Sequence, residues 1–123
     1  MIQAIEQMSL NKEPIKNYSA RSTKKHAKIQ SLVGLIAILR NAQLNGLKIV
    51  QAHGVFDLLH VGHIRHLEQA KELGNILVVT ITPDRFVNKG PHRPAFTEKL
   101  RAHALAALES VDYVAATESP TSV

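Results

Sequence analysis

The 123-residue sequence predicts an α/β fold, a parallel sheet with helices on both faces, and three observations support this prediction. Residues 76–82 are mostly β-branched and almost wholly apolar, which is typical of a parallel strand covered on both faces. Shorter apolar runs at 48–52 and 113–116 lie on either side of it along the chain. Segments with helical spacing separate the three runs, and this alternation implies parallel pairing through right-handed crossovers. We therefore expect one βαβαβ half of a Rossmann-like sheet.

Residues 1–30 are expected to form a basic leader that is disordered or weakly helical. They hold six basic side chains against two acidic ones, one aromatic residue and no sustained periodicity. Residues 31–123, the expected folded domain, hold nine basic and eight acidic side chains, so the net charge of +5 belongs mainly to the leader. A basic tail suits nucleic acid, but a solvated leader explains it as well, and no nucleic-acid partner is predicted.

One helix is predicted between the leader and the first strand. It should begin after Ser31, whose hydroxyl suits an N-cap, and end at Asn45-Gly46. Its apolar residues recur at helical spacing: Leu32, Leu35, Ile36 and Leu39.

Two further helices are predicted between the strands. The first runs to about Leu73 and is followed by Gly74, where we expect a left-handed backbone conformation. The second is capped by Thr97 and carries Glu98 in its first turn. Its expected apolar face consists of Leu100, Ala104, Leu105 and Leu108.

The stretch 54–63 (Gly-Val-Phe-Asp-Leu-Leu-His-Val-Gly-His) is the most informative feature of the chain, because it joins the first strand to the following helix. A helix N-terminus offers free backbone N–H groups and the positive end of a dipole, which suit a phosphate. His60 and His63 lie at this junction, with Gly62 directly before the second histidine. We interpret the stretch as a site that binds a polyphosphate and stabilises the charge that develops on it. The two common glycine-rich phosphate loops are absent from the sequence.

The same stretch resembles the first signature of the cytidylyltransferase-like nucleotidyltransferases, the superfamily with the HIGH-type motif. The resemblance continues through Lys89, the Glu-x-x-Arg run at 98–101 and the Val-Asp pair at 111–112, and covers about residues 48–116. Within the superfamily the sequence most resembles the sugar-phosphate adenylyltransferase domain of ADP-heptose synthase-like proteins. Glycerol-3-phosphate cytidylyltransferase is a near relation.

This resemblance implies transfer of AMP or CMP from ATP or CTP to a sugar or polyol phosphate, with Mg²⁺ as cofactor and pyrophosphate as the leaving group. It implies that His60 and His63 donate hydrogen bonds to phosphate oxygens, and that Lys89 reaches the triphosphate or the acceptor phosphate. These three are the catalytic candidates. The nucleotide-binding candidates are Gly54, Val55, Phe56, Asp57, Gly62 and Arg101. No residue is assigned as a metal ligand.

Some of these residues also have a purely structural interpretation. Asp57 is equally suited to brace the loop by accepting backbone N–H bonds, and Phe56 to pack in the core. Arg101 is equally suited to form an ion pair. For His53, directly before the motif, two orientations are open, one toward the site and one away from it.

Composition excludes several classes of protein. The chain has no cysteine, so a disulfide, a thiolate zinc site and a cysteine nucleophile are excluded. No apolar run approaches the roughly 18 residues needed to span a bilayer, and the N-terminus lacks the order of a secretory signal. We expect a cytoplasmic protein whose partners are a nucleoside triphosphate and a phosphorylated small molecule, with no membrane partner.

The relatives carry a second signature, Ile-Ser-Ser/Thr-Thr-x-Lys/Arg, which closes over the β- and γ-phosphates, and this sequence has none. We expect a domain whose C-terminal part is missing, or else a catalytically inert chain that binds nucleotide or a protein partner. A third alternative, an aminoacyl-tRNA synthetase fragment, shares the motif but fits the Phe56-Asp57 pair less well. A sheet of three strands leaves an open edge, so a homodimer or poor solubility is predicted.

Overall fold

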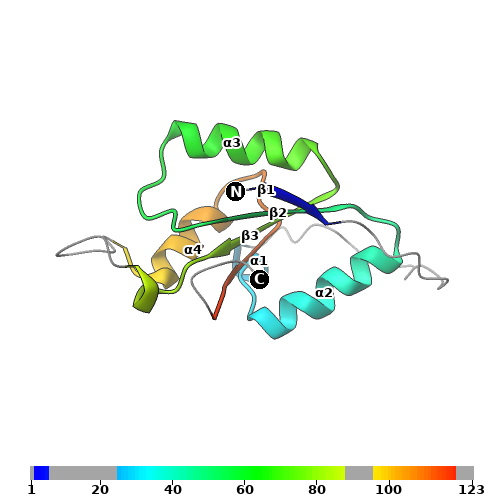
Figure 1. Cartoon of the computed structure of the whole chain (residues 1–123), viewed down its shortest axis with the longest axis horizontal. Coiled ribbons are helices and arrows are strands. Elements are labelled where there is room, and N and C mark those ends of the chain that lie inside the picture. Colours follow the sequence, from blue (N-terminus) through cyan, green and yellow to red (C-terminus); the bar gives the residue numbers. More distant parts are fainter. Residues whose placement is uncertain (1, 6–24, 88–95, 119–123) are drawn as a thin grey trace.

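The computed structural model describes residues 2–5, 25–87 and 96–118, and Figure 1 shows one sheet with helices on both faces. The sheet has four strands in the order β1-β2-β3-β4. The strands are β1 (Ile2–Ile5), β2 (Ile49–Gly54), β3 (Ile76–Ile81) and β4 (Tyr113–Ala116). The helices are α1 (Lys25–Lys28), α2 (Leu32–Leu44), α3 (Val61–Glu72) and α4 (Glu98–Ala106), with one 3₁₀ turn, η1 (Asp84–Phe86).

The predicted βαβαβ unit is confirmed. β2, β3 and β4 are parallel neighbours, and α3 and α4 connect them in sequence. The register places Gly54 beside Ile81, and Ile81 beside Ala116. The three strands therefore end at one common carboxyl edge, and this is the edge at which ligands of open α/β sheets bind. The motif at 54–63 starts there.

The core has one apolar layer on each face of the sheet. α3 and α4 cover one face, where Leu67, Ala70 and Leu105 pack against the strands. α2 covers the other face through Leu35 and Ala42. All six residues of β3 are buried, as predicted for a strand covered on both sides. No helix in the described part of the chain is both long and apolar enough to cross a bilayer.

The leader contributes to the sheet, which the sequence did not predict. β1 pairs antiparallel with β2, from Ile2 opposite Ala52 to Ile5 opposite Ile49, so the sheet is mixed. The unpaired N–H and C=O groups along the edge of β2 explain why an extended segment pairs there. At the other edge, Ile29 forms a bridge with Val114 and covers part of the edge that we expected to be open. Dimerisation stays a prediction.

One expectation about the helices was wrong in part and another was wrong. Of the face expected for α4, Leu105 is buried and Leu108 packs against the core, but Leu100 and Ala104 are exposed, and the side chain of Arg101 takes an inward position. Gly74 does not have a left-handed conformation, and among the described glycines only Gly46 has a positive φ, of 80°. Gly74 is needed for space instead, since an added Cβ would lie 2.9 Å from the Lys48 carbonyl oxygen.

The close approach at Gly74 leads to a stability prediction. We expect Gly74→Ala to lower the free energy of unfolding by about 1–3 kcal/mol, because the Lys48 backbone, directly before β2, must shift to admit the methyl group. Gly34→Ala in α2 is the control, since its Cβ would meet only flexible side chains, Ser31 Oγ at 3.1 Å first. Urea unfolding of both variants checks this, and equal stability of the two would contradict the packing argument.

Candidate functional site

The motif loop between β2 and α3 has an unusual backbone conformation at one residue and a close packing contact at another. Phe56 has a φ of 51°, the one positive value for a non-glycine residue in the described ranges. Its ring folds back over Gly54, where an added Cβ would lie 2.9 Å from the ring. The ring also packs against the core on the α3 face, which confirms its predicted structural role. The glycine and the phenylalanine together fix the direction in which the chain enters α3.

His60 is the N-cap of α3, and the cap defines which ring nitrogen can donate. Its Nδ1 accepts a hydrogen bond from the Gly62 backbone N–H at 3.0 Å. A neutral ring whose Nδ1 accepts must carry its proton on Nε2, which is then free to donate. An added Cβ on Gly62 would lie 2.7 Å from Cε1 of His60, so the glycine makes room for the imidazole. The cap thus presents an N–H donor at the helix N-terminus.

His63 lies in the first turn of α3, against His60. The two ring centroids are 4.0 Å apart, and the edge of Phe56 contacts His63 with the centroids 5.6 Å apart. Nδ1 of His63 is buried with no hydrogen-bond partner among the described residues. Burial lowers the pKa of His63, and nearby His60 and His66 add to this, while the Leu58 backbone opposes it. His63 is therefore a neutral imidazole near pH 7, in a position that an added negative charge would stabilise.

The lowered pKa of His63 makes stability depend on pH. Below the ordinary value of 6.5, the unfolded chain binds a proton at this ring more readily than the folded chain does. We therefore expect the free energy of unfolding to fall as pH drops below 6.5, and to fall less in His63→Gln. Urea unfolding at about pH 7.5 and about pH 5.5 checks the difference between the two proteins. Parallel losses in both would show that His63 is not its source.

Arg101 connects the motif to two other segments. Its side chain is fully buried and donates to the Phe96 carbonyl at 3.1 Å, the Val55 carbonyl at 2.8 Å and Asp84 Oδ1 at 2.7 Å. In return, Asp57 Oδ1 accepts a hydrogen bond from the Phe96 N–H at 2.9 Å. Arg101 thus connects the motif loop to α4 and to η1, and Asp57 connects it to the segment directly before α4. A direct contact of Arg101 or Asp57 with nucleotide stays a prediction.

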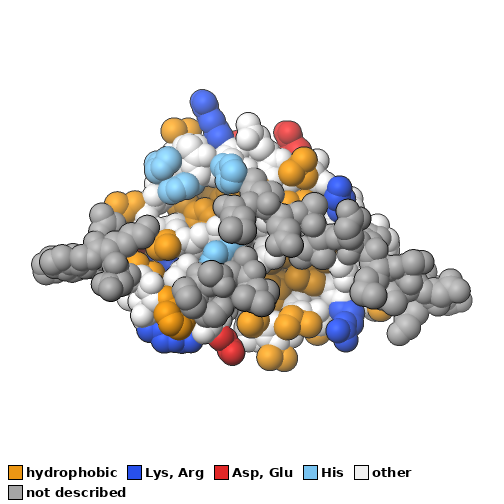
Figure 2. Space-filling view, in the orientation of Figure 1, with side chains coloured by type: hydrophobic (Ala, Val, Ile, Leu, Met, Phe, Trp, Pro, Cys, Tyr) orange, Lys and Arg blue, Asp and Glu red, His pale blue; other side chains and the backbone are white. Residues whose placement is uncertain are grey.

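The structure brings most of the predicted site residues together, but one lies outside the described residues. His60, His63, Gly54, Val55 and Gly62 come together at the carboxyl edge, while Lys89 lies outside the described residues. Figure 2 shows histidine side chains gathered over the first part of α3. Sequence reasoning missed Asp84, the acidic partner of Arg101. The acidic residue just after the second strand was a usable signal, because the carboxyl ends of parallel strands share one edge.

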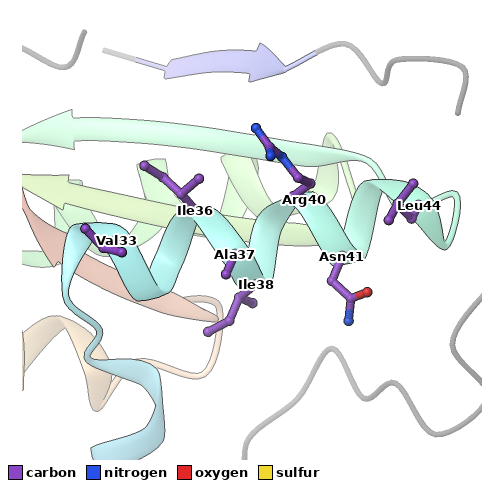
Figure 3. Close-up of a pocket in the computed structure, with 7 residues that line it drawn as sticks. All are labelled: Val33, Ile36, Ala37, Ile38, Arg40, Asn41 and Leu44. Atoms are coloured by element: carbon purple, nitrogen blue, oxygen red, sulfur yellow. The ribbon is translucent and has the colours of Figure 1, made fainter.

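Two cavities differ in what they offer. One of about 370 Å³ adjoins the motif and is lined by Phe56, Asp57, Leu59, Phe96, Leu100, Arg101, His103 and Ala104. A larger one of about 540 Å³ lies on α2, on the other side of the sheet. In Figure 3 its side chains point to different sides of the helix, so it is an open surface, and Arg40 is its single charged residue. Of these two cavities, the one of about 370 Å³ is the one beside the motif.

Three parallel strands and a helix N-terminus with two histidines at their carboxyl edge define an α/β domain with a Rossmann-like sheet. The chain belongs to the cytidylyltransferase-like family, whose model matches residues 52–121. This confirms the superfamily resemblance and the Rossmann-like fold expected from the sequence.

Similar proteins agree with this assignment. Bifunctional protein HldE of Geobacter metallireducens is 48% identical over 90 residues, and HldE of Methylobacillus flagellatus is 45% identical over 98 residues. The matches cover 72% and 78% of this chain, which spans only 18% and 20% of those relatives. The crystal structure of the lipopolysaccharide core biosynthesis protein from Thermoplasma volcanium superposes with a TM-score of 0.52 at 36% identity, covering 57% of each chain.

Proposed function

We propose that the chain transfers AMP or CMP from ATP or CTP to the phosphate group of a sugar or polyol phosphate, with release of pyrophosphate. The observation that carries this proposal is the His60–His63 pair at the N-terminus of α3, with ring centroids 4.0 Å apart. Family membership supports the reaction class. The solved relative is a lipopolysaccharide core biosynthesis protein, which favours a saccharide-derived acceptor.

Nucleotidyl transfer of this kind does not require a covalent intermediate with the protein. An oxygen of the acceptor phosphate forms a bond to the α-phosphorus of the triphosphate, and the bond from that phosphorus to the bridging oxygen breaks. Pyrophosphate leaves with the electron pair, and no proton has to be removed from an ionised phosphate nucleophile. Rate enhancement then comes from positioning and from stabilising negative charge. These are the two tasks for which the motif is suited.

The histidines perform these tasks in different ways. His60 would donate from Nε2 to an oxygen of the α-phosphate, because its Nδ1 is already held by Gly62. His63 would add a second donor, and phosphate binding would offset the burial that lowers its pKa. The backbone N–H groups of the first turn of α3 that are not used by the His60 cap would complete the anion site. Lys89 would supply a cation from its loop.

Magnesium fits this arrangement as a companion of the triphosphate. Among the described residues no three carboxylate, histidine or cysteine side chains cluster as a metal site. Mg²⁺ commonly keeps its waters and is held mainly by substrate phosphates, so no such cluster is required. Its role when bound would be to neutralise phosphate charge.

The test is a binding and turnover experiment on the full chain. We expect calorimetry to detect MgATP or MgCTP binding, and a coupled assay to detect pyrophosphate when a sugar or polyol phosphate is added. Binding without pyrophosphate release would favour the second candidate, a catalytically inert nucleotide-binding chain. Failure to bind either triphosphate would reject both.

A further inference from the structure

A row of polar side chains crosses the α2 face of the sheet, on the side opposite α3 and α4. It comprises Gln51 and His53 of β2, Thr80 of β3 and Thr82 just after β3, and we name it the polar ladder. Gln51 Nε2 donates to Thr80 Oγ1 at 3.1 Å. His53 joins the two threonines, with Nδ1 2.8 Å from Thr80 Oγ1 and Nε2 3.4 Å from Thr82 Oγ1.

The polar ladder occupies positions that sheets of this kind usually fill with apolar residues. Nearer the amino ends of the strands, the same face carries Ile49, Ile76 and Val78, which pack under α2. Thr80 and Thr82 are only 4% and 5% exposed. Buried hydroxyls and an imidazole add little net stability compared with an apolar core, so packing alone does not account for them. The change to polar residues occurs toward the carboxyl edge, where ligands bind.

The hydrogen bonds of the polar ladder form a continuous chain. A side-chain amide nitrogen can only donate, so Thr80 Oγ1 accepts from Gln51, and it meets Nδ1 of His53 as donor or acceptor according to the tautomer of the ring. The Thr82 hydroxyl ends the chain: it accepts from Nε2 of His53 in one tautomer and donates to it in the other, and in both it keeps hydrogen-bonding capacity for a ligand. The Thr82 backbone N–H donates to the Gly54 carbonyl at 3.1 Å. The end of the polar ladder therefore lies directly beside the first residue of the phosphate motif.

The chemistry of the polar ladder selects its ligand. Its members are an amide, two hydroxyls and an imidazole, which both donate and accept but carry no fixed charge, and such groups suit alcohol hydroxyls. A phosphate dianion is better served by the histidine pair at α3. A cavity of about 190 Å³ adjoins the polar ladder and is lined by Gln51, Val78 and Thr80 of the strands and by Leu32, Leu35, Ile36 and Leu39 of α2.

We infer that the polar ladder is the subsite for the hydroxyl groups of the acceptor, with Thr82 and His53 as its contact residues. The inference rests on the proposed function and names the side of the carboxyl edge from which the acceptor approaches. Nucleotide phosphates would lie on the α3 side of that edge, and the acceptor carbon chain on the α2 side.

The test compares phosphates that differ only in hydroxyl groups. The first pair is glycerol 3-phosphate and propyl phosphate, and the second is glucose 1-phosphate and cyclohexyl phosphate. In NMR titrations of the full chain, we expect the hydroxylated member of at least one pair to bind about tenfold more tightly, the value of one hydrogen bond to a buried partner. Equal affinity within both pairs would overturn the inference.

Variants of the chain test whether the polar ladder causes the preference for hydroxylated phosphates. Thr82→Val should abolish the preference for the hydroxylated member, and Thr82→Ser should keep it. Thr117→Val is the matched control, because Thr117 is also a buried threonine at the carboxyl end of a strand but lies outside the polar ladder. A preference that persists in Thr82→Val would overturn the inference. If Thr82→Val does not fold, the inference is tested by the hydroxyl preference of His53→Gln and by that of the wild-type chain.

Triphosphate binding separates this inference from the proposed function. Thr82→Val should bind MgATP or MgCTP as tightly as the wild-type chain does. If the wild-type chain binds triphosphate but does not distinguish the hydroxylated phosphates, the inference about the acceptor subsite is rejected and the proposed function is not. Loss of triphosphate binding in the wild-type chain would remove the proposed function as well.

Discussion

Replacing both His60 and His63 with alanine is expected to lower the rate of pyrophosphate release by at least about 100-fold, since loss of one preorganised donor typically costs 100- to 1,000-fold. The physical reason is that His60 presents Nε2–H at the helix N-terminus, while His63 is a neutral ring whose buried Nδ1 has no hydrogen-bond partner among the described residues. Negative charge added beside the two rings would strengthen the interactions of both. A coupled pyrophosphate assay at saturating triphosphate measures the effect.

His66→Ala is the control for this double variant, because His66 is exposed one turn further along α3. We expect it to retain most of the activity of the wild-type chain. Pyrophosphate release that continues unchanged in the double variant would show that the histidine pair does not act in the reaction.

Arg101→Met is expected to lower the free energy of unfolding by about 3 kcal/mol, the lower end of the range for breaking a buried ion pair. The lower end applies because Asp84 remains 39% exposed and can be solvated after the change. The Val55 and Phe96 carbonyls lose their donor, and the motif loop loses its connection to α4. Urea unfolding monitored by circular dichroism measures the loss.

The matched control for Arg101 is Arg65→Met, because Arg65 is an exposed arginine of α3. It should change the free energy of unfolding by less than about 0.5 kcal/mol. If Arg101→Met were as stable as this control, the guanidinium would not hold the motif in place.

The sheet was predictable because its signals are local. An apolar β-branched run identified β3, and Tyr113–Ala116 was predicted with the bounds that β4 has. The helix caps Ser31 and Thr97 were also predictable, since each accepts from a backbone N–H three residues later. β1 was not, because its pairing with β2 joins residues 44 to 50 positions apart and depends on an open edge.

Parts of the site were hidden for a related reason. The partners of Arg101 lie 46 and 17 residues away in sequence, at Val55 and Asp84, so the spacing of residues around the arginine does not reveal them. His53 was correctly noted beside the motif, but its role depends on the register that places it opposite Thr80. A signal was nevertheless present, since Thr-Ile-Thr at 80–82 puts two hydroxyls on one face of an otherwise apolar strand.

The most direct test of nucleotidyl transfer is the fate of labelled phosphorus. The full chain would be incubated with Mg²⁺, a sugar or polyol phosphate, and ATP or CTP labelled at either the α- or the γ-phosphorus. We predict that α-label enters the acceptor product and that γ-label appears only in pyrophosphate, because the proposed role of the histidine pair is to bind the α-phosphate. Transfer of the γ-label to the acceptor, or transfer of neither label, would contradict the account.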